Sequence, residues 1–351
     1  MLKRRTEVIG LELTPRKERI LSSVVTGYVK SGEPVGSKAV AEEVGVSSAT
    51  VRNEMADLIE LGLLEQPHTS AGRVPSQKGY REYVDHLMKV PPLKEESARA
   101  FDSMLFSGSY DPEGLLERAC RLLAGTTRCA AVVSTPSGDS AQVRAVQFVQ
   151  TSRRTAMLIL MSSTGTMKSR VFRCDYDLTN EIMRVFFRVF NGKLVGKNVA
   201  DITPAFLQGV GVSLGQMYVL MGAPMRALLE VARDTIGTHL LLGGQMNLLF
   251  YPELEQTDVR HILDLLEQRD DLAELLRQRT GQVVIRIGRE LGRPELDKTS
   301  LAVSRYLVEG QDAGALAVLG PVRMDYPRVT AILQYVSQQV GKTLTTLLRD
   351  Q

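Results

Sequence analysis

Near the start of the chain, a short stretch combines the residue types that contact bases in DNA. A helix beginning at Ser47 would carry one face that is small, polar and nearly free of acidic side chains, formed by Ser48, Ala49, Arg52, Asn53 and Ala56. Arginine and asparagine can pair with guanine and adenine edges in the major groove, and small side chains allow close approach. We therefore interpret Arg52 and Asn53 as candidate base-contacting residues.

The first turn of the same helix is suited to the DNA backbone. Ser47 and Ser48 can offer hydroxyl groups and helix N-terminal amides to a phosphate, and Thr50 lies beside them. An isolated Arg–Asn pair on a helix would more often be an ordinary solvated face. The sequence that follows favours the DNA interpretation, because it predicts a second DNA-contacting element.

This second element is the loop from His68 to Pro75, which follows a glycine-terminated helix and a short strand. Arg73 and the hydroxyl of Thr69 would lie near the tip of a hairpin, where such groups can touch phosphates or the minor groove. The position of His68 in the same loop makes it a candidate as well. The loop is typical of the wing of a winged helix.

Capping residues and apolar spacing predict the elements that would position these side chains. Thr14 and Pro15 begin a helix over residues 14–31, and Ser37 begins a short one that ends before Gly45. The recognition helix would span residues 47–61, and a further helix would begin at Ser76. Together with the wing, these helices predict a winged helix-turn-helix domain.

The order of these motifs resembles the HrcA family of bacterial heat-shock repressors. The resemblance rests on "SSATVRNEMADLIELGLL" and "HTSAGRVPS" in this domain, and on "GGQMNLLFYPE" at 243–253 and "GALAVLGPVRMDYPRV" at 314–329. It implies a homodimer that binds a double-stranded inverted-repeat operator, CIRCE, ahead of class I heat-shock chaperone operons. It also implies regulation by the GroE chaperonin, with GroEL as a partner.

The rest of the chain predicts an α+β multidomain protein. Strands are expected around residues 129–135, 141–151, 155–162 and 167–174, and again around 283–287, 301–309 and 313–319, before a closing helix at 328–348. From residue 176 to residue 254, helical patterns replace the strand-rich pattern and suggest an insertion. We predict a DNA-binding domain at 1–93, a sheet domain at 94–175 and 255–351, and an inserted domain at 176–254. By resemblance, the sheet domain is GAF-like and the insertion is the dimerisation domain.

Other functional classes find less support in the sequence. No apolar run is long enough to span a bilayer, so we expect a cytoplasmic protein without a membrane partner. The three cysteines and four histidines lack metal-ligand spacing, and no catalytic constellation stands out, so no metal, cofactor or enzyme activity is expected. Two alternatives stay open: a repressor that senses a small molecule in its GAF-like domain, and an enzyme built on the C-terminal half.

Overall fold

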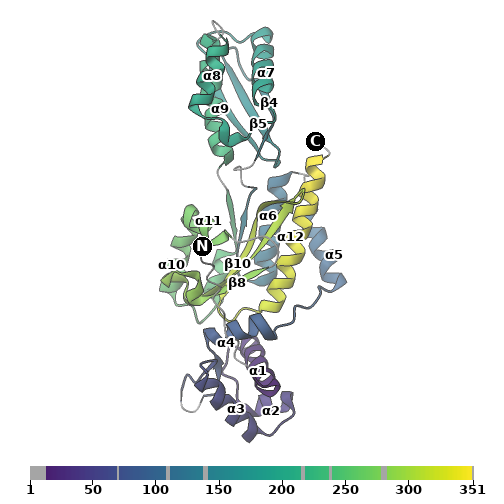
Figure 1. Cartoon of the computed structure of the whole chain (residues 1–351), viewed down its shortest axis with the longest axis vertical. Coiled ribbons are helices and arrows are strands. Elements are labelled where there is room, and N and C mark those ends of the chain that lie inside the picture. Colours follow the sequence, from purple (N-terminus) through teal and green to yellow (C-terminus); the bar gives the residue numbers. More distant parts are fainter. Residues whose placement is uncertain are drawn as a thin grey trace, which may run out of the picture.

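A computed structural model describes most of the chain as three bodies arranged along one long axis (Figure 1). The DNA-binding domain lies at one end, a sheet domain in the middle and a smaller α/β body at the other end. None of the described helices is long and apolar enough to cross a membrane. The described residues are 13–68, 71–107, 111–136, 141–214, 218–236, 239–277 and 283–349.

The N-terminal domain has the predicted winged helix-turn-helix fold. Its elements are α1 (Pro15–Ser31), α2 (Ser37–Val44), α3 (Ser48–Glu60), β1 (Leu64–Glu65), β2 (Val74–Pro75) and α4 (Gln77–Glu82), continued by a π-helical turn at Tyr83–Leu87. Thr14 caps α1 by accepting a hydrogen bond from the amide of Lys17. Gly32 and Gly45 end α1 and α2 in the left-handed conformation that glycine adopts without strain. The helix bounds predicted from the sequence are confirmed to within one residue at either end.

The middle body is a five-stranded antiparallel sheet in the order β7-β3-β10-β9-β8. Its strands are β3 (Ala130–Ser134), β7 (Leu240–Gly243), β8 (Val284–Ile287), β9 (Thr299–Val308) and β10 (Gln311–Pro321). The helices of this body are α5 (Glu95–Leu105), α6 (Pro112–Thr127), α10 (Gln256–Glu267), α11 (Arg269–Leu276) and α12 (Tyr326–Arg349). Sheet and helices together confirm the predicted mixed α and β character of this part of the chain.

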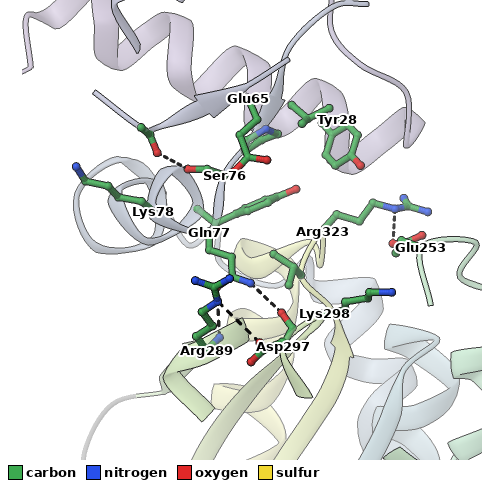
Figure 2. A pocket seen from close by; sticks show the side chains of 15 residues that line it. Tyr28, Glu65, Ser76, Gln77, Lys78, Glu253, Arg289, Asp297, Lys298 and Arg323 are labelled. Carbon is green, nitrogen blue, oxygen red and sulfur yellow. Dashed lines mark hydrogen bonds and ion pairs between the residues drawn. The ribbon is translucent and has the colours of Figure 1, made fainter. Parts of the chain in front are cut away.

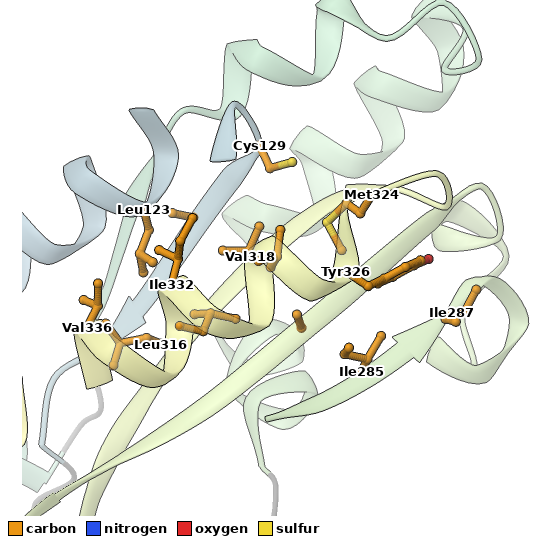
Figure 3. Close-up of a cluster of buried hydrophobic side chains, with 14 of the residues drawn as sticks. Leu123, Cys129, Ile285, Ile287, Leu316, Val318, Met324, Tyr326, Ile332 and Val336 are labelled. Atoms are coloured by element: carbon orange, nitrogen blue, oxygen red, sulfur yellow. The ribbon is translucent and has the colours of Figure 1, made fainter. Parts of the chain in front are cut away.

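Each face of this sheet is covered by its own set of helices. Figure 3 shows one face, where Leu123 of α6 and Ile332 and Val336 of α12 pack toward Leu316 and Val318 of β10. A second cluster covers the other face with leucines of α10 and α11. Cys120, Cys129 and Cys174 are buried and free, and burial raises the pKa of Cys120 to about 12.

The third body begins earlier in the sequence than we predicted. Its strands β4 (Val143–Gln150), β5 (Thr155–Ser162) and β6 (Met167–Arg173) pair only with one another, as a sheet separate from the middle one. They share a core with α7 (Asn180–Leu194), α8 (Pro204–Leu214) and α9 (Tyr218–Ile236).

The inserted body therefore covers residues 141–236, whereas the predicted insertion was 176–254. The difference at the start arises because β4 to β6 bury their apolar side chains against α7 and α9 instead of extending the middle sheet. The difference at the end arises because β7 pairs with β3 of the middle sheet, between Leu240–Ser134 and Gly243–Ala131. Residues 240–254 thus belong to the middle body.

The winged helix is packed directly onto the middle body. One continuous cluster of buried apolar side chains runs from α1 and α3 to β10 and α12, and the ring of Tyr80 meets the ring of Tyr326 edge-on at 5.8 Å. Arg81 donates from Nη2 to the carbonyl of Ile285 at 2.7 Å and from Nε to the carboxylate of Glu290 at 2.8 Å. These contacts fix the orientation of the DNA-binding domain.

Removing the Arg81 side chain should weaken this domain contact. We expect Arg81→Ala to cost about 1.5–3 kcal/mol, the range for hydrogen bonds to a charged group. Calorimetry should then show the winged helix unfolding at a lower temperature than the middle body. Lys89→Ala, which removes an exposed side chain between the π-helical turn and α5, is the matched control. If Arg81→Ala unfolds in one transition at the unchanged temperature, the contact does not hold the two domains together.

Candidate DNA-binding surface

The recognition helix α3 is fixed in the domain by its apolar side. Val51, Met55 and Leu58 are buried at successive turns. Ser47 caps the helix, because its hydroxyl accepts a hydrogen bond from the amide of Thr50 at 3.1 Å and lies 2.8 Å from the Thr50 hydroxyl. Ser47 and Thr50 thus define the start of the helix that would enter the major groove.

The opposite side of α3 presents the predicted base-contacting residues to solvent. Arg52 and Asn53 are both exposed, and neither side chain forms a hydrogen bond or ion pair with any residue in the described part of the chain. Their polar groups are free to contact another molecule. An exposed arginine and asparagine on the first two turns of this helix match the side chains used for base recognition in the major groove.

Two of the three acidic residues of α3 form ion pairs with α1, whereas Glu60 in its last turn is exposed and forms no ion pair in the described chain. Lys17 lies 2.8 Å from the carboxylate of Asp57 and 3.3 Å from that of Glu54, and Arg16 lies 3.4 Å from Glu54. Hydrogen bonds to Asp57 and Glu54 hold the pKa of Lys17 above its usual value. Both carboxylates are therefore neutralised by α1, and this lowers the repulsion that a DNA backbone would meet. The sequence reasoning missed this pairing, because only the fold brings α1 beside α3.

Ser48 contacts a neighbouring helix, in addition to the phosphate contact that the sequence predicts. Its side chain is half-buried, and its hydroxyl lies 3.2 Å from the hydroxyl of Ser37 at the start of α2. This contact ties the two helices of the helix-turn-helix together. The contact of Ser48 with a phosphate stays a prediction.

The wing is held against the turn between α1 and α2. β1 and β2 pair through Leu64–Pro75 and Glu65–Val74, and Arg73 and Val35 exchange two backbone hydrogen bonds of 2.9 Å. Gly72 fits closely here, since an added Cβ would lie 2.5 Å from the carbonyl oxygen of Val35. This bridge sets the position of the wing relative to α3.

The predicted wing residues differ in how far they are exposed to solvent. Arg73 is half-buried, and its Nη1 donates to the carbonyl oxygens of Ala71 and Gly72 at 3.1 and 3.4 Å. Its Nε is buried without a partner among the described residues. His68 is exposed, and Thr69 lies outside the described residues. In this structure the guanidinium of Arg73 thus lies against the wing backbone, and DNA contact by Arg73 or His68 stays a prediction.

The described residues contain no group of three or more His, Cys, Asp or Glu side chains that could hold a metal ion. The arrangement that remains is a helix-turn-helix followed by a two-stranded wing, with a free polar face on the second helix. This fold and surface define the class of winged-helix DNA-binding proteins.

Comparison with known proteins identifies the family. Residues 12–86 match the family model described as "Winged helix-turn-helix transcription repressor, HrcA DNA-binding", and residues 113–330 match "HrcA protein C terminal domain". The chain belongs to the HrcA family of transcription repressors. This is a family of regulators and not a class of enzymes.

Relatives with the name "Heat-inducible transcription repressor HrcA" match over almost their full length. The relative from Desulforudis audaxviator is 36% identical over 340 residues, covering 95% of this chain and 98% of its own. The relative from Moorella thermoacetica is 36% identical over 346 residues, covering 97% and 100%. A solved structure titled as a hypothetical protein shares the fold, with a TM-score of 0.70 and 24% identity over 96% of this chain and 100% of its own.

The close fit of Gly72 makes it a test of the wing position. We expect Gly72→Ala to destabilise the protein by about 1–3 kcal/mol, because the new methyl group must push against backbone that cannot rotate away. Urea denaturation measures the effect. Gly125→Ala is the matched control, since an added Cβ meets nothing within 4 Å there; in a helix it should be neutral or stabilising by about 0.5–1 kcal/mol. Equal stability of both variants would contradict the bridge between the wing and Val35.

Proposed function

We propose that the protein represses class I heat-shock chaperone operons by binding the CIRCE inverted repeat as a homodimer. The observation that carries this proposal is the face of α3, where Arg52 and Asn53 are exposed and unpaired within the described residues and the nearby acids are neutralised from α1. A helix with this surface can read bases, while Ser47, Ser48 and the wing residues His68, Thr69 and Arg73 contact the backbone. Membership of the HrcA family supports the choice of this operator.

An inverted repeat requires two winged helices related by a two-fold axis. The inserted body offers a surface for this pairing. The face of its sheet opposite α7 and α9 carries three cross-strand rows without a charged side chain, and the exposed Arg173 lies at the end of this face, opposite Thr155. The rows are Val149–Met157–Val171, Gln147–Ile159–Ser169 and Ala145–Met161–Met167.

This sheet face is apolar and open to solvent within the described chain. Val171 is 59% exposed and Met167 is 56% exposed, one on each outer row of the edge strand β6. A monomer gains nothing from exposing such side chains, whereas two copies that bury them gain roughly 25 cal/mol per Å² of apolar surface. We assign the face to contact with a second copy of the chain, and the inserted body to dimerisation of a GAF-like middle domain.

Regulation by the GroE chaperonin completes the proposal, and family membership supports it. A repressor that needs GroEL to reach its folded state loses DNA affinity when misfolded proteins occupy the chaperonin. Because domains are stable by only about 5–15 kcal/mol, a small loss of stability is enough to change the population that binds DNA. The chaperonin would in this way connect protein damage to release of the operator.

Operator binding tests the first part of the proposal. At fixed salt, we expect the protein to prefer a labelled CIRCE-type inverted repeat over a scrambled duplex. Arg52→Ala should weaken binding to the repeat by about 1–3 kcal/mol, as loss of a base contact does, with little effect on the scrambled duplex. Arg99→Ala, which removes an exposed arginine of α5, serves as the control. Equal binding to both duplexes after folding with GroEL would exclude this operator.

Oligomeric state tests the dimer surface. Val171→Asp would place a charge in one apolar row of the proposed contact, and we expect it to shift the protein from dimer to monomer in sedimentation equilibrium. Val219→Asp is the matched control: Val219 is 80% exposed in the first turn of α9, where an acidic residue is favoured. A dimer that survives Val171→Asp and dissociates with Val219→Asp would place the interface on the helical side instead.

A further inference from the structure

A cleft of about 560 Å³ lies between the winged helix and the middle body. One wall is formed by residues of α1, β2 and α4, and the other by the loops around residues 253, 289, 297 and 323 (Figure 2). Its volume falls in the range of binding sites for small molecules. Such binding sites occur preferentially between domains. None of the base-contacting residues proposed above lines this cleft.

Two hydroxyl groups of the cleft lack partners within the described chain. Tyr80 is only 2% exposed, and its hydroxyl is buried without a hydrogen bond. Tyr28 lines the same cleft, and its hydroxyl likewise forms no hydrogen bond with the described residues. Tyr28 is half-buried, so only the hydroxyl of Tyr80 carries the destabilising cost of a buried group without a partner. A ligand with hydrogen-bond acceptors would relieve that cost.

The charges of the cleft are of both signs, and Glu65 lines it with an exposed carboxylate that forms no ion pair in the described chain. An anion is therefore favoured only at the end where the cations are least compensated. Three of its four cations already meet carboxylates: Arg323 lies 2.6 Å from Glu253, Lys298 lies 2.8 Å from Asp258, and Arg289 meets Asp297 at 3.8 Å. Lys78 meets no carboxylate of the described chain, and its amine donates to the carbonyl oxygen of Leu61 at 2.9 Å.

Lys78 and Arg289 therefore carry the positive charge that is least compensated. The side chain of Arg289 is 85% exposed, so the 3.8 Å contact with Asp297 leaves its guanidinium accessible. Figure 2 shows Lys78 and Arg289 toward one end of the cleft, on different domains, and Tyr28 and Arg323 toward the other. An anion at the first end would touch both domains.

Between these ends, the lining is apolar and includes two aromatic rings. Tyr28 and Tyr80 lie on the DNA-binding side with Pro75, and Val322 lies on the other wall. A planar ring could pack among these side chains while its substituents reach the unpartnered hydroxyls. We propose that the cleft binds a ring-bearing phosphate monoester of about nucleotide size, with the phosphate between Lys78 and Arg289.

Such a ligand would act on the orientation of the winged helix, because it contacts both domains at their junction. A ligand that binds one orientation better than another shifts the protein toward that orientation. The binding site does not depend on the proposed operator. The effect of the ligand on DNA affinity does rest on the proposed function, and it is measured separately.

The test is a calorimetric titration of the full-length protein with three probes: adenosine 5′-monophosphate, inorganic phosphate and adenosine. We expect the monophosphate to bind more tightly than phosphate or adenosine alone. Lys78→Ala and Arg289→Ala should each weaken it about tenfold, the effect of losing one charge-assisted hydrogen bond. Lys89→Ala removes an exposed lysine outside the cleft and should leave binding unchanged.

Tyr80→Phe gives a readout that a merely structural role would not produce. Without the probe, the variant should be at least as stable as the original protein, since it loses a buried hydroxyl that has no partner. With the probe, its affinity for the monophosphate should fall. Opposite effects on stability and affinity would support the proposed site.

Three results would overturn the proposal. No binding of the monophosphate removes the site, and equal binding by the Lys78, Arg289 and Lys89 variants places the probe elsewhere. Phosphate that binds as tightly as the monophosphate shows an anion site without the ring. Because these titrations contain no DNA, loss of probe binding leaves the operator assignment standing, and failure of operator binding leaves the cleft standing.

Discussion

The direct packing of the winged helix on the middle body is the constraint on which the rest of the structure depends. Tyr80 meets Tyr326 at this junction, and the buried apolar cluster continues through it without a break. A DNA-binding domain on a flexible linker could rotate to fit many half-site spacings. Here the direction of α3 relative to the middle body is determined by the side chains that pack at this junction.

The electrostatic character of the DNA-binding face depends on the ion pairs that α1 forms with acidic residues of α3. α3 carries acidic residues close to Arg52 and Asn53, and these would repel phosphates if they were free. Arg16 and Lys17 bind both carboxylates, although each exposed ion pair contributes little to stability. Their value lies in the electrostatic field of the surface, because a paired carboxylate repels phosphates less and opposes the positive charge of Arg52 less. A pairing that stabilises the fold only slightly can therefore matter for recognition.

The sequence predicted the winged helix well because its signals are local. Thr14, Ser47 and Ser76 each cap a helix through contacts three residues away, and such patterns are visible in the sequence itself. The inserted body was misplaced because strand pairing is not local. The alternating residues of β5 would suit either sheet, and only the packing of α7 and α9 decides which sheet forms.

The same distinction applies to the candidate site. The exposure of Arg52 and Asn53 followed from helical spacing, whereas the half-buried guanidinium of Arg73 and the hydroxyl contact between Ser37 and Ser48 depend on how separate elements pack. The cleft at the domain junction could not be foreseen at all, since its walls come from segments more than 200 residues apart, as the hydrogen bond from Gln77 to the carbonyl of Asp297 illustrates.

A rigid junction also determines where regulation can act efficiently. With the dimer surface assigned to one end of the molecule and the recognition helix at the other (Figure 1), a small rotation at the junction would be amplified into a large displacement of α3. Half-site spacing on DNA is fixed, so in the proposed dimer such a rotation would cost contacts in one or both half-sites. A coupling free energy of about 1–3 kcal/mol changes affinity by about 5- to 150-fold. Contacts of the size made by Arg81 are therefore sufficient to control such a repressor, without any change in the bases that α3 can read.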